Sequence, residues 1–303
     1  MKKLLTLAIC FFSIITFAQQ SILENSWTRF TRDSTTNEKL EASLNSFLAE
    51  TNKANFDIKE VTQEHYKQYE YFFQQFEEYS NSTYFKDSLF FKPQLLKSFS
   101  YDKKEFYITI QFIGTAEDKF LAKSILELKA VPKEDYYQFF CLFPENTKTW
   151  KIEMKNGVTF HYSDTYDEEK ATKFVNFNKL LEKLTKKKSP ITNYYKCKDT
   201  QEALDVFGIK YSYRRSNSDY GFGLSDNLGN FITGINSEDY LHDHVHSFFG
   251  KIYENKDTWR EFEEGIAIYY GDNWGVPLSE LKDILRDELK KYPQRFPGAY
   301  ELC

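Results

Sequence analysis

The sequence has few cysteines, few histidines, no excess of positive charge and no long membrane-spanning apolar run. Its 303 residues include four cysteines and five histidines, and no two cysteines form a CxxC pair. This scarcity argues against a disulfide framework and against a cysteine-based zinc knuckle. Lys and Arg total 40 against 45 Asp and Glu, a formal net charge of −5. That balance argues against a nucleic-acid partner and against an anionic membrane surface.

The remaining composition is that of a globular protein. Hydrophobic residues make up 41% of the chain and charged residues 28%, and the sequence shows neither an internal repeat nor a low-complexity linker. A chain of this length accommodates two domains of ordinary size.

The first eighteen residues are predicted to be a signal peptide. Lys2 and Lys3 form a positive start, residues 4–17 form an apolar run too short for a stable bilayer anchor, and Thr16-Phe17-Ala18 resembles a small-x-small cleavage site. We therefore expect an exported protein, periplasmic or secreted, with no stable membrane anchor after cleavage.

The cysteines leave two alternatives open. Cys10 lies in a loose lipobox, but the bulky Ile9 and the apolar sequence that continues past Cys10 favour one uninterrupted signal segment. Cys141, Cys197 and Cys303 are widely spaced, which allows one long-range bridge and favours buried, unreactive thiols.

The N-terminal half is predicted to place helices before an antiparallel sheet. Residues 23 to about 80 carry apolar positions at helical spacing, namely Leu40, Leu44, Phe47 and Leu48. Residues 106–113 and 125–131 are predicted strands, and Asn156-Gly157 between two alternating runs predicts a β-hairpin. The fold class expected is α+β, with an N-terminal α+β domain of unknown role over 19–165. His65 and His161 lack sequence partners and are expected at ordinary surface or core positions.

The C-terminal half, 166–303, is predicted to alternate helices and strands. A helix is expected over residues 170–190, with Phe174, Phe177, Leu180, Leu181 and Leu184 inward. Further elements are a strand over 191–197, a short helix from Asp199 or Thr200 to Val206 that ends at Gly208, and strands over 209–213 and 230–235.

Three of the five histidines lie within residues 242–246. Asn236 or Ser237 is a candidate helix cap, and an apolar stripe follows at Leu241, Val245, Phe248 and Ile252. On this helix, His242 and His246 are four residues apart and share the face beside the stripe, so both can contact one cation. His244 is expected to point elsewhere, toward solvent or the surroundings of the site.

Two further helices are predicted after the histidine segment. Residues 258–261 form a capping box, Glu264 falls in the second turn, and Gly271 is a natural stop. A third helix, Pro277 to about Tyr292, has an apolar face that is expected to brace the other two.

This segment resembles a known family. His242-Asp243-His244-Val245-His246 resembles the HExxH zinc helix with Asp in the Glu position, an HDxxH variant, and Glu264-Gly265-Ile266-Ala267 resembles the E-G-x-A segment of gluzincin metallopeptidases. Seventeen residues separate His246 from Glu264, close to the spacing in aminopeptidase-type gluzincins. The resemblance covers about residues 165–303, with a possible edge strand over 230–235, and it implies a zincin-like domain.

The resemblance implies a secreted zinc metallopeptidase that hydrolyses peptide bonds of a peptide or protein substrate. His242, His246 and Glu264 would hold Zn²⁺ with an open position for an activated water, and Asp243 would be the general base. Glu263 is the competing ligand, but it falls on a different helix face. The candidates for stabilising an oxyanion are Tyr269, Tyr270 and Arg286.

Whether Asp243 can act as the general base separates two hypotheses. Its side chain is one methylene shorter than Glu, and a misplacement of about 1 Å can cost about 100-fold in rate. The first hypothesis is an active metallopeptidase, and the second is a catalytically silent peptidase-like module that binds peptide or protein partners through the same cleft.

Overall fold

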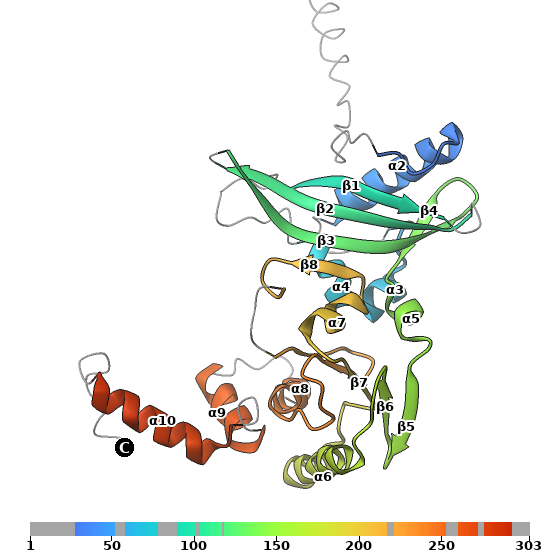
Figure 1. The fold of residues 1–303 in the computed structure, drawn as a ribbon. Helices are drawn as coiled ribbons and strands as arrows, with labels where there is room; N and C mark the ends of the chain where they lie inside the picture. The colour runs from blue at the N-terminus through green and yellow to red at the C-terminus, as the bar shows by residue number, and fades with distance from the viewer. Residues whose placement is uncertain are drawn as a thin grey trace, which may run out of the picture. The chain divides into compact units, whose positions relative to one another are not determined.

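A computed structural model of the chain confirms the α+β class (Figure 1). The structure describes residues 28–51, 58–77, 90–100, 104–116, 118–216, 221–252, 260–271 and 276–292. Three features discussed above lie outside these ranges: the expected signal peptide with Cys10, the C-terminal Cys303, and residues 258 and 259 of the expected capping box. Within the described ranges, no helix is both long and apolar enough to cross a bilayer.

The chain forms two compact units, each described separately below. The first comprises residues 1–62, 76–123 and 129–140, and the second comprises residues 63–75, 124–128 and 141–303. We expected a division at residue 165, and this grouping differs from it. The reason is that the strand over residues 158–162, before residue 165, pairs with the strand over residues 193–196, after it.

The first unit combines one long helix with an antiparallel sheet. Helix α2 (Ser34–Glu50) starts at Asp33, whose side chain accepts a hydrogen bond from the Thr36 amide. The sheet has the order β1-β2-β3-β4, with bounds β1 Lys92–Phe99, β2 Phe106–Ala116, β3 Lys119–Pro132 and β4 Tyr137–Phe140. The strands predicted over 106–113 and 125–131 are β2 and β3, both longer than predicted.

The apolar face predicted for residues 40–48 forms the core of this unit. Leu40, Leu44, Phe47 and Leu48 are all fully buried. Phe47 contacts Phe76 and Phe139, with ring centroids 5.0 and 5.3 Å apart. The helix-before-sheet pattern is therefore correct for the described part of the first unit.

The second unit is built around a mixed sheet of order β5-β6-β7-β10-β9. Its strands are β5 Lys151–Lys155, β6 Val158–Tyr162, β7 Asn193–Lys196, β9 Gly223–Ser225 and β10 Asn230–Thr233. β6 pairs with β7 in parallel and β7 pairs with β10 in parallel, whereas the two outer pairs are antiparallel. The remaining strand, β8 Ile209–Ser212, pairs with residues 124–126 of β3.

The predicted hairpin is present, and the predicted edge strand is not at the edge. Asn156 and Gly157 have φ values of 46° and 87°, the left-handed pair that a tight two-residue hairpin turn requires. β10, which corresponds to the strand predicted over 230–235, lies between β7 and β9. The three-residue strand β9 forms the edge of the described sheet, and its shortness explains why periodicity did not reveal it.

The helices of the second unit have the following bounds: α3 Gln63–Gln68, α4 Glu70–Glu77, α5 Phe143–Thr147, α6 Glu168–Thr185, α7 Thr200–Asp205, α8 His242–Ile252, α9 Arg260–Gly271 and α10 Leu278–Lys291. The last two residues of α4 belong to the first unit. Helix α7 matches its prediction, with Asp199 as its N-cap and Gly208 at φ 90° just beyond it.

Helices α6 and α8 pack on one face of the sheet. Phe174 of α6 contacts Phe160 of β6 and Tyr194 of β7, and Phe248 of α8 belongs to the same buried cluster. The prediction for α6 was wrong in two respects. The helix ends at Thr185, because Lys186 adopts the left-handed conformation, and Leu180 and Leu184 are exposed rather than inward.

Helix α10 matches its predicted bounds, and its predicted apolar face is only partly buried. Leu289 is buried, Leu278 and Leu281 are partly buried, and Leu285 is 50% exposed. The proposal that α10 braces the two preceding helices therefore stays a prediction.

Candidate metal centre

The histidine helix begins later than its sequence predicts. We expected a cap at Asn236 or Ser237, but α8 starts at His242, and its first helical hydrogen bond runs from the Val245 amide to the Leu241 carbonyl over 2.9 Å. Asn236 instead has a left-handed φ of 52°. Glu238 and Asp239 therefore belong to the preceding loop.

Tertiary contacts account for the delayed helix start. Glu238 is 2% exposed and pairs with the equally buried Lys196 of β7, with 3.3 Å between the Lys196 Nζ and the Glu238 Oε1. Its Oε1 also accepts a hydrogen bond from the Asp167 amide. The Tyr194 hydroxyl donates to the Ser237 carbonyl over 2.6 Å. These contacts hold the loop in a non-helical conformation, and they outweigh the local preference of its residues for a helical first turn.

The predicted apolar stripe of α8 is confirmed where it is described. Leu241, Val245 and Phe248 are 6%, 1% and 0% exposed, and they join the core on the sheet. The side chain of Ile252 lies outside the description. This stripe fixes the rotation of the helix, so His242 and His246 face away from the sheet core.

His244 does not point toward solvent, contrary to our expectation. It is fully buried, and neither ring nitrogen has a hydrogen-bond partner among the described residues. Four aromatic rings surround it, at centroid distances between 4.7 and 6.2 Å: Phe174, Phe177, Phe231 and Phe248. Burial lowers the pKa of His244 to about 3. His244 is therefore a neutral core residue.

Helix α9 brings Glu264 to the two histidines. Ala267, one turn after Glu264, is fully buried in the core cluster, and α9 ends at Gly271 as predicted. Ala267 and Gly271 lie on the same side of α9 as Glu264, because positions 264, 267 and 271 share one face of a helix. Gly271 on this face lies against the backbone of His242 in α8. The structure thus selects Glu264, rather than Glu263, as the carboxylate that meets the histidines.

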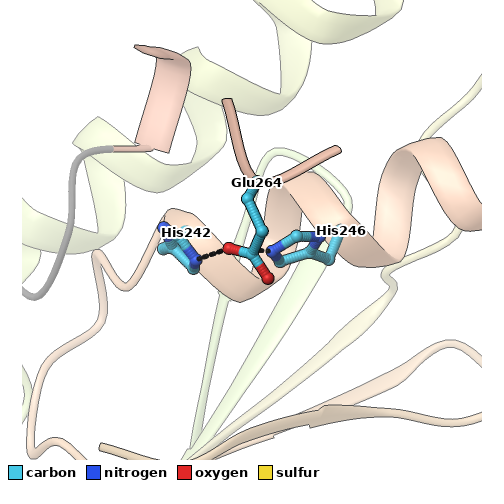
Figure 2. A group of neighbouring side chains, drawn as sticks. All are labelled: His242, His246 and Glu264. Atoms are coloured by element: carbon cyan, nitrogen blue, oxygen red, sulfur yellow. Dashed lines mark ion pairs between the residues drawn. The ribbon is translucent and has the colours of Figure 1, made fainter. Parts of the chain in front are cut away.

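The three side chains converge on one point (Figure 2). The Glu264 Oε2 lies 3.4 Å from the His242 Nε2 and 3.4 Å from the His246 Nε2. The ligand atoms of all three residues lie within 4.8 Å of one another. His242 is nearly buried, with a side-chain exposure of 10%, whereas His246 and Glu264 are exposed at 29% and 45%. The group is therefore supported from the core and open on its outer side.

This donor set is suited to a divalent cation that accepts nitrogen and oxygen ligands. Two imidazole nitrogens and one carboxylate oxygen are a common ligand set for zinc in catalytic sites. Two atoms that each lie about 2.1 Å from a tetrahedral zinc ion are about 3.4 Å apart. The two separations from Glu264 agree with that spacing. With all three ligand atoms within 4.8 Å of one another, the side chains are close enough to contact a single cation.

Asp243 projects from α8 toward strand β9. A methyl group at Gly223 of β9 would lie 2.3 Å from the Asp243 Oδ2 and 2.6 Å from its Cβ, so this side chain packs directly on the strand backbone. Burial raises the pKa of the Asp243 carboxyl above its ordinary value, and a side-chain hydrogen bond with Tyr240 opposes part of that rise. A raised pKa moves a carboxylate toward the range of an effective general base near neutral pH.

A pocket of about 410 Å³ adjoins His246 and Asp243. The other residues that line it are Gly223, Leu224, Ser225, Asn227, Ser247 and Gly250. Sequence reasoning missed this wall, because β9 is only three residues long and shows no periodicity. The lining consists mostly of small side chains, which leaves room for a ligand beside the metal-binding group.

The other histidines and the described cysteines have structural roles, as predicted. The His65 Nε2 accepts a hydrogen bond from the Cys141 amide over 3.0 Å, and burial lowers the pKa of His65 to about 4. His161 stacks on Tyr195 at a centroid distance of 4.2 Å. Cys141 and Cys197 are both buried free thiols.

The proposed oxyanion stabilisers gain no support from their surroundings. Arg286 pairs with Asp283 over 2.7 Å. Tyr270 packs against the core cluster, and Tyr269 is 64% exposed. Their suggested role stays a prediction.

Comparison with known proteins provides no relative. No family model matches the chain, and neither curated proteins nor solved structures yield a match. The geometry of the site and the motif resemblance are therefore the features that bear on function.

Proposed function

We propose that this protein is a zinc-dependent metallopeptidase with His242, His246 and Glu264 as its ligands. One observation carries the proposal: a carboxylate from a separate helix lies 3.4 Å from both histidine Nε2 atoms. Two histidines four residues apart on a helix are common, whereas a third ligand at matching distance from both is a much stronger indication. The resemblance to gluzincins supports the same ligand set.

The chain's own residues divide the work of peptide hydrolysis. When bound, zinc would lower the pKa of a water molecule and polarise a peptide carbonyl. His242 and His246 would have to be neutral for their nitrogen lone pairs to serve as ligands. Asp243 would accept the proton of the attacking water and pass it to the leaving amine. Its partly buried carboxyl, with a raised pKa, is suited to both steps.

The substrate would be an extended peptide lying along β9. This three-residue strand lines the pocket beside His246 and Asp243 and forms the edge of the described sheet. An exposed strand edge can pair with an extended peptide through main-chain hydrogen bonds. The peptide bond would then lie between the metal-binding group and Asp243.

A second candidate function is a catalytically silent module that binds a peptide or protein in this cleft. The Asp243 carboxylate is packed against the Gly223 backbone and is shorter than the glutamate of the motif. If it stops about 1 Å short of the attacking water, the rate would fall about 100-fold. Metal binding would be unaffected in that case.

The first experiment is metal analysis of the purified protein. We expect about one equivalent of zinc in the wild type, much less in His246→Ala, and a wild-type amount in His244→Leu. His244→Leu is the matched control, because it removes a histidine from the same helix without touching the metal-binding group. Less than about half an equivalent in the wild type, with no change in His246→Ala, would rule out the metal site.

The second experiment separates the active enzyme from the silent module. Peptide turnover is measured for the wild type, Asp243→Asn and Asp243→Glu at equal zinc content. An active enzyme requires the wild type to be clearly faster than Asp243→Asn, since the amide cannot accept the proton. A wild type no faster than Asp243→Asn, together with an active Asp243→Glu variant, identifies the silent module.

A further inference from the structure

Helix α9 touches the start of α8 through a glycine. A Cβ atom at Gly271 would lie 2.7 Å from both the Cα and the backbone nitrogen of His242, and 2.8 Å from the carbonyl carbon of Leu241. These are backbone atoms, so rotation of a side chain cannot relieve the overlap. The two helices approach this closely because residue 271 has no side chain.

The same side of α9 carries the third ligand. Glu264, Ala267 and Gly271 occupy positions i, i+3 and i+7, which lie along one face of a helix. At 1.5 Å per residue, Glu264 lies about 10 Å from Gly271 along the helix axis. Ala267 between them is fully buried. A displacement of the α9 backbone at Gly271 would therefore be transmitted to Glu264 by a short, regular and packed helical segment.

We propose that Gly271 is a positioning residue for the metal centre: its backbone contact with His242 sets the distance at which Glu264 meets the histidine pair. This inference rests on the proposed function, in which the three side chains hold zinc. The E-G-x-A segment ends at Ala267, so the role proposed here belongs to a residue beyond that segment.

The geometry indicates the size of the effect. Ordinary contact of a Cβ atom begins at 3.4 Å. A methyl group at 2.7 Å would therefore push the helices apart by about 0.7 Å, whereas distances in a metal site tolerate only about 0.2 Å. Disturbing residues that orient metal ligands lowers affinity by roughly 10- to 100-fold. We expect Gly271→Ala to weaken zinc binding by that factor.

Gly265 provides a matched control. It lies next to Glu264 in the same helix, is exposed, and a Cβ atom there would meet nothing within 4 Å. Gly265→Ala makes the same chemical change and improves helix propensity in the same way. We expect its zinc affinity to equal that of the wild type.

The test is a double-mutant cycle read by zinc affinity. Zinc dissociation constants are measured for the wild type, Gly271→Ala, Glu264→Ala and the double variant, with Gly265→Ala alongside. If Gly271 acts through Glu264, Gly271→Ala costs little further affinity once Glu264 is gone. Additive losses, or a wild-type affinity in Gly271→Ala, would overturn the inference.

A shorter ligand gives a second test that does not depend on the folding of Gly271→Ala. If the glycine contact fixes α9, the helix cannot move to compensate for a missing methylene, and Glu264→Asp should bind zinc nearly as weakly as Glu264→Ala. An affinity of Glu264→Asp close to that of the wild type would mean that α9 adjusts freely, and the inference would be wrong.

A metal-independent readout separates this inference from the proposed function. Crystal structures of metal-free wild type and Gly271→Ala should show the Glu264 carboxylate farther from both histidines in the variant. A wild type that binds no zinc defeats the proposed function but leaves this displacement measurable. An unchanged Glu264 position, with only the last turn of α9 frayed, defeats the inference alone.

Discussion

Replacing His244 with leucine should make the protein more stable and leave its metal affinity unchanged. His244 is the central histidine of a three-histidine segment and lies between the two candidate ligands, His242 and His246. In the structure it is 0% exposed, and both ring nitrogens lack a hydrogen-bond partner among the described residues. Leucine has a similar size and no polar atom, so it should fit the aromatic surroundings better.

The expected gain follows from the buried nitrogens. A buried donor or acceptor without a partner costs about 1–3 kcal/mol, because it loses its hydrogen bonds to water on folding. The change of shape can cost up to about 1.5 kcal/mol, as volume-conserving core substitutions do. Two such nitrogens cost at least about 2 kcal/mol and the shape change costs at most about 1.5 kcal/mol, so we expect a net gain of at least about 0.5 kcal/mol in the free energy of unfolding, with roughly 2–4 °C in Tm per kcal/mol for a unit of this size.

The assay is urea unfolding of metal-free wild type and His244→Leu at pH 8. Metal-free protein is needed, because any bound metal adds its own stabilisation to the folded state. At this pH free imidazoles are neutral, so protonation of the unfolded chain does not contribute. Zinc affinity is measured in parallel.

A clear loss of stability in His244→Leu would refute the reasoning, since it would show that the imidazole has a favourable polar partner. A loss of zinc affinity at unchanged stability would instead make His244 part of the metal centre.

Three further predictions follow from the buried charges and close contacts. His65 has a folded-state pKa of about 4 against an ordinary value of 6.5, so stability falls as the pH drops from 6.5 toward 4; the contribution of His65 to the loss between pH 8 and pH 5 should be about 2 kcal/mol, measured by urea unfolding as the difference between the losses of the wild type and of His65→Gln. Lys196→Met leaves the buried Glu238 carboxylate without its cationic partner and should cost about 3–5 kcal/mol, part of which Lys196→Met/Glu238→Gln should recover in the same assay. Gly223→Ala places a methyl group 2.3 Å from the Asp243 Oδ2; peptide turnover should fall roughly 100-fold at unchanged zinc content, and unchanged turnover would argue against Asp243 as the base.

The local sequence was sufficient to predict the α+β class, much of the secondary structure and the pairing of His242 with His246, to which the motif resemblance added Glu264. The stripe of Leu241, Val245 and Phe248 predicts one buried helix face, and that periodicity alone places His242 and His246 beside it. The Asn156-Gly157 turn is equally local, because both residues accept positive φ values. Such features depend on neighbours within one or two turns of the chain.

Only the tertiary structure decided the boundaries and the surroundings of the site. The Lys196–Glu238 ion pair joins residues far apart in the chain and delays the start of α8, which no local propensity could reveal. The burial of His244 depends on helix α6 and the sheet packing around it. The strands on either side of residue 165 pair with one another, and β9 beside Asp243 is too short to show a period. Sequence periodicity thus placed His242 and His246 on one face, because helical preferences act between near neighbours, whereas Glu264 and Asp243 entered through the motif resemblance. The tertiary structure decided how closely they meet, because packing, buried charge and strand pairing act between segments that the sequence keeps apart.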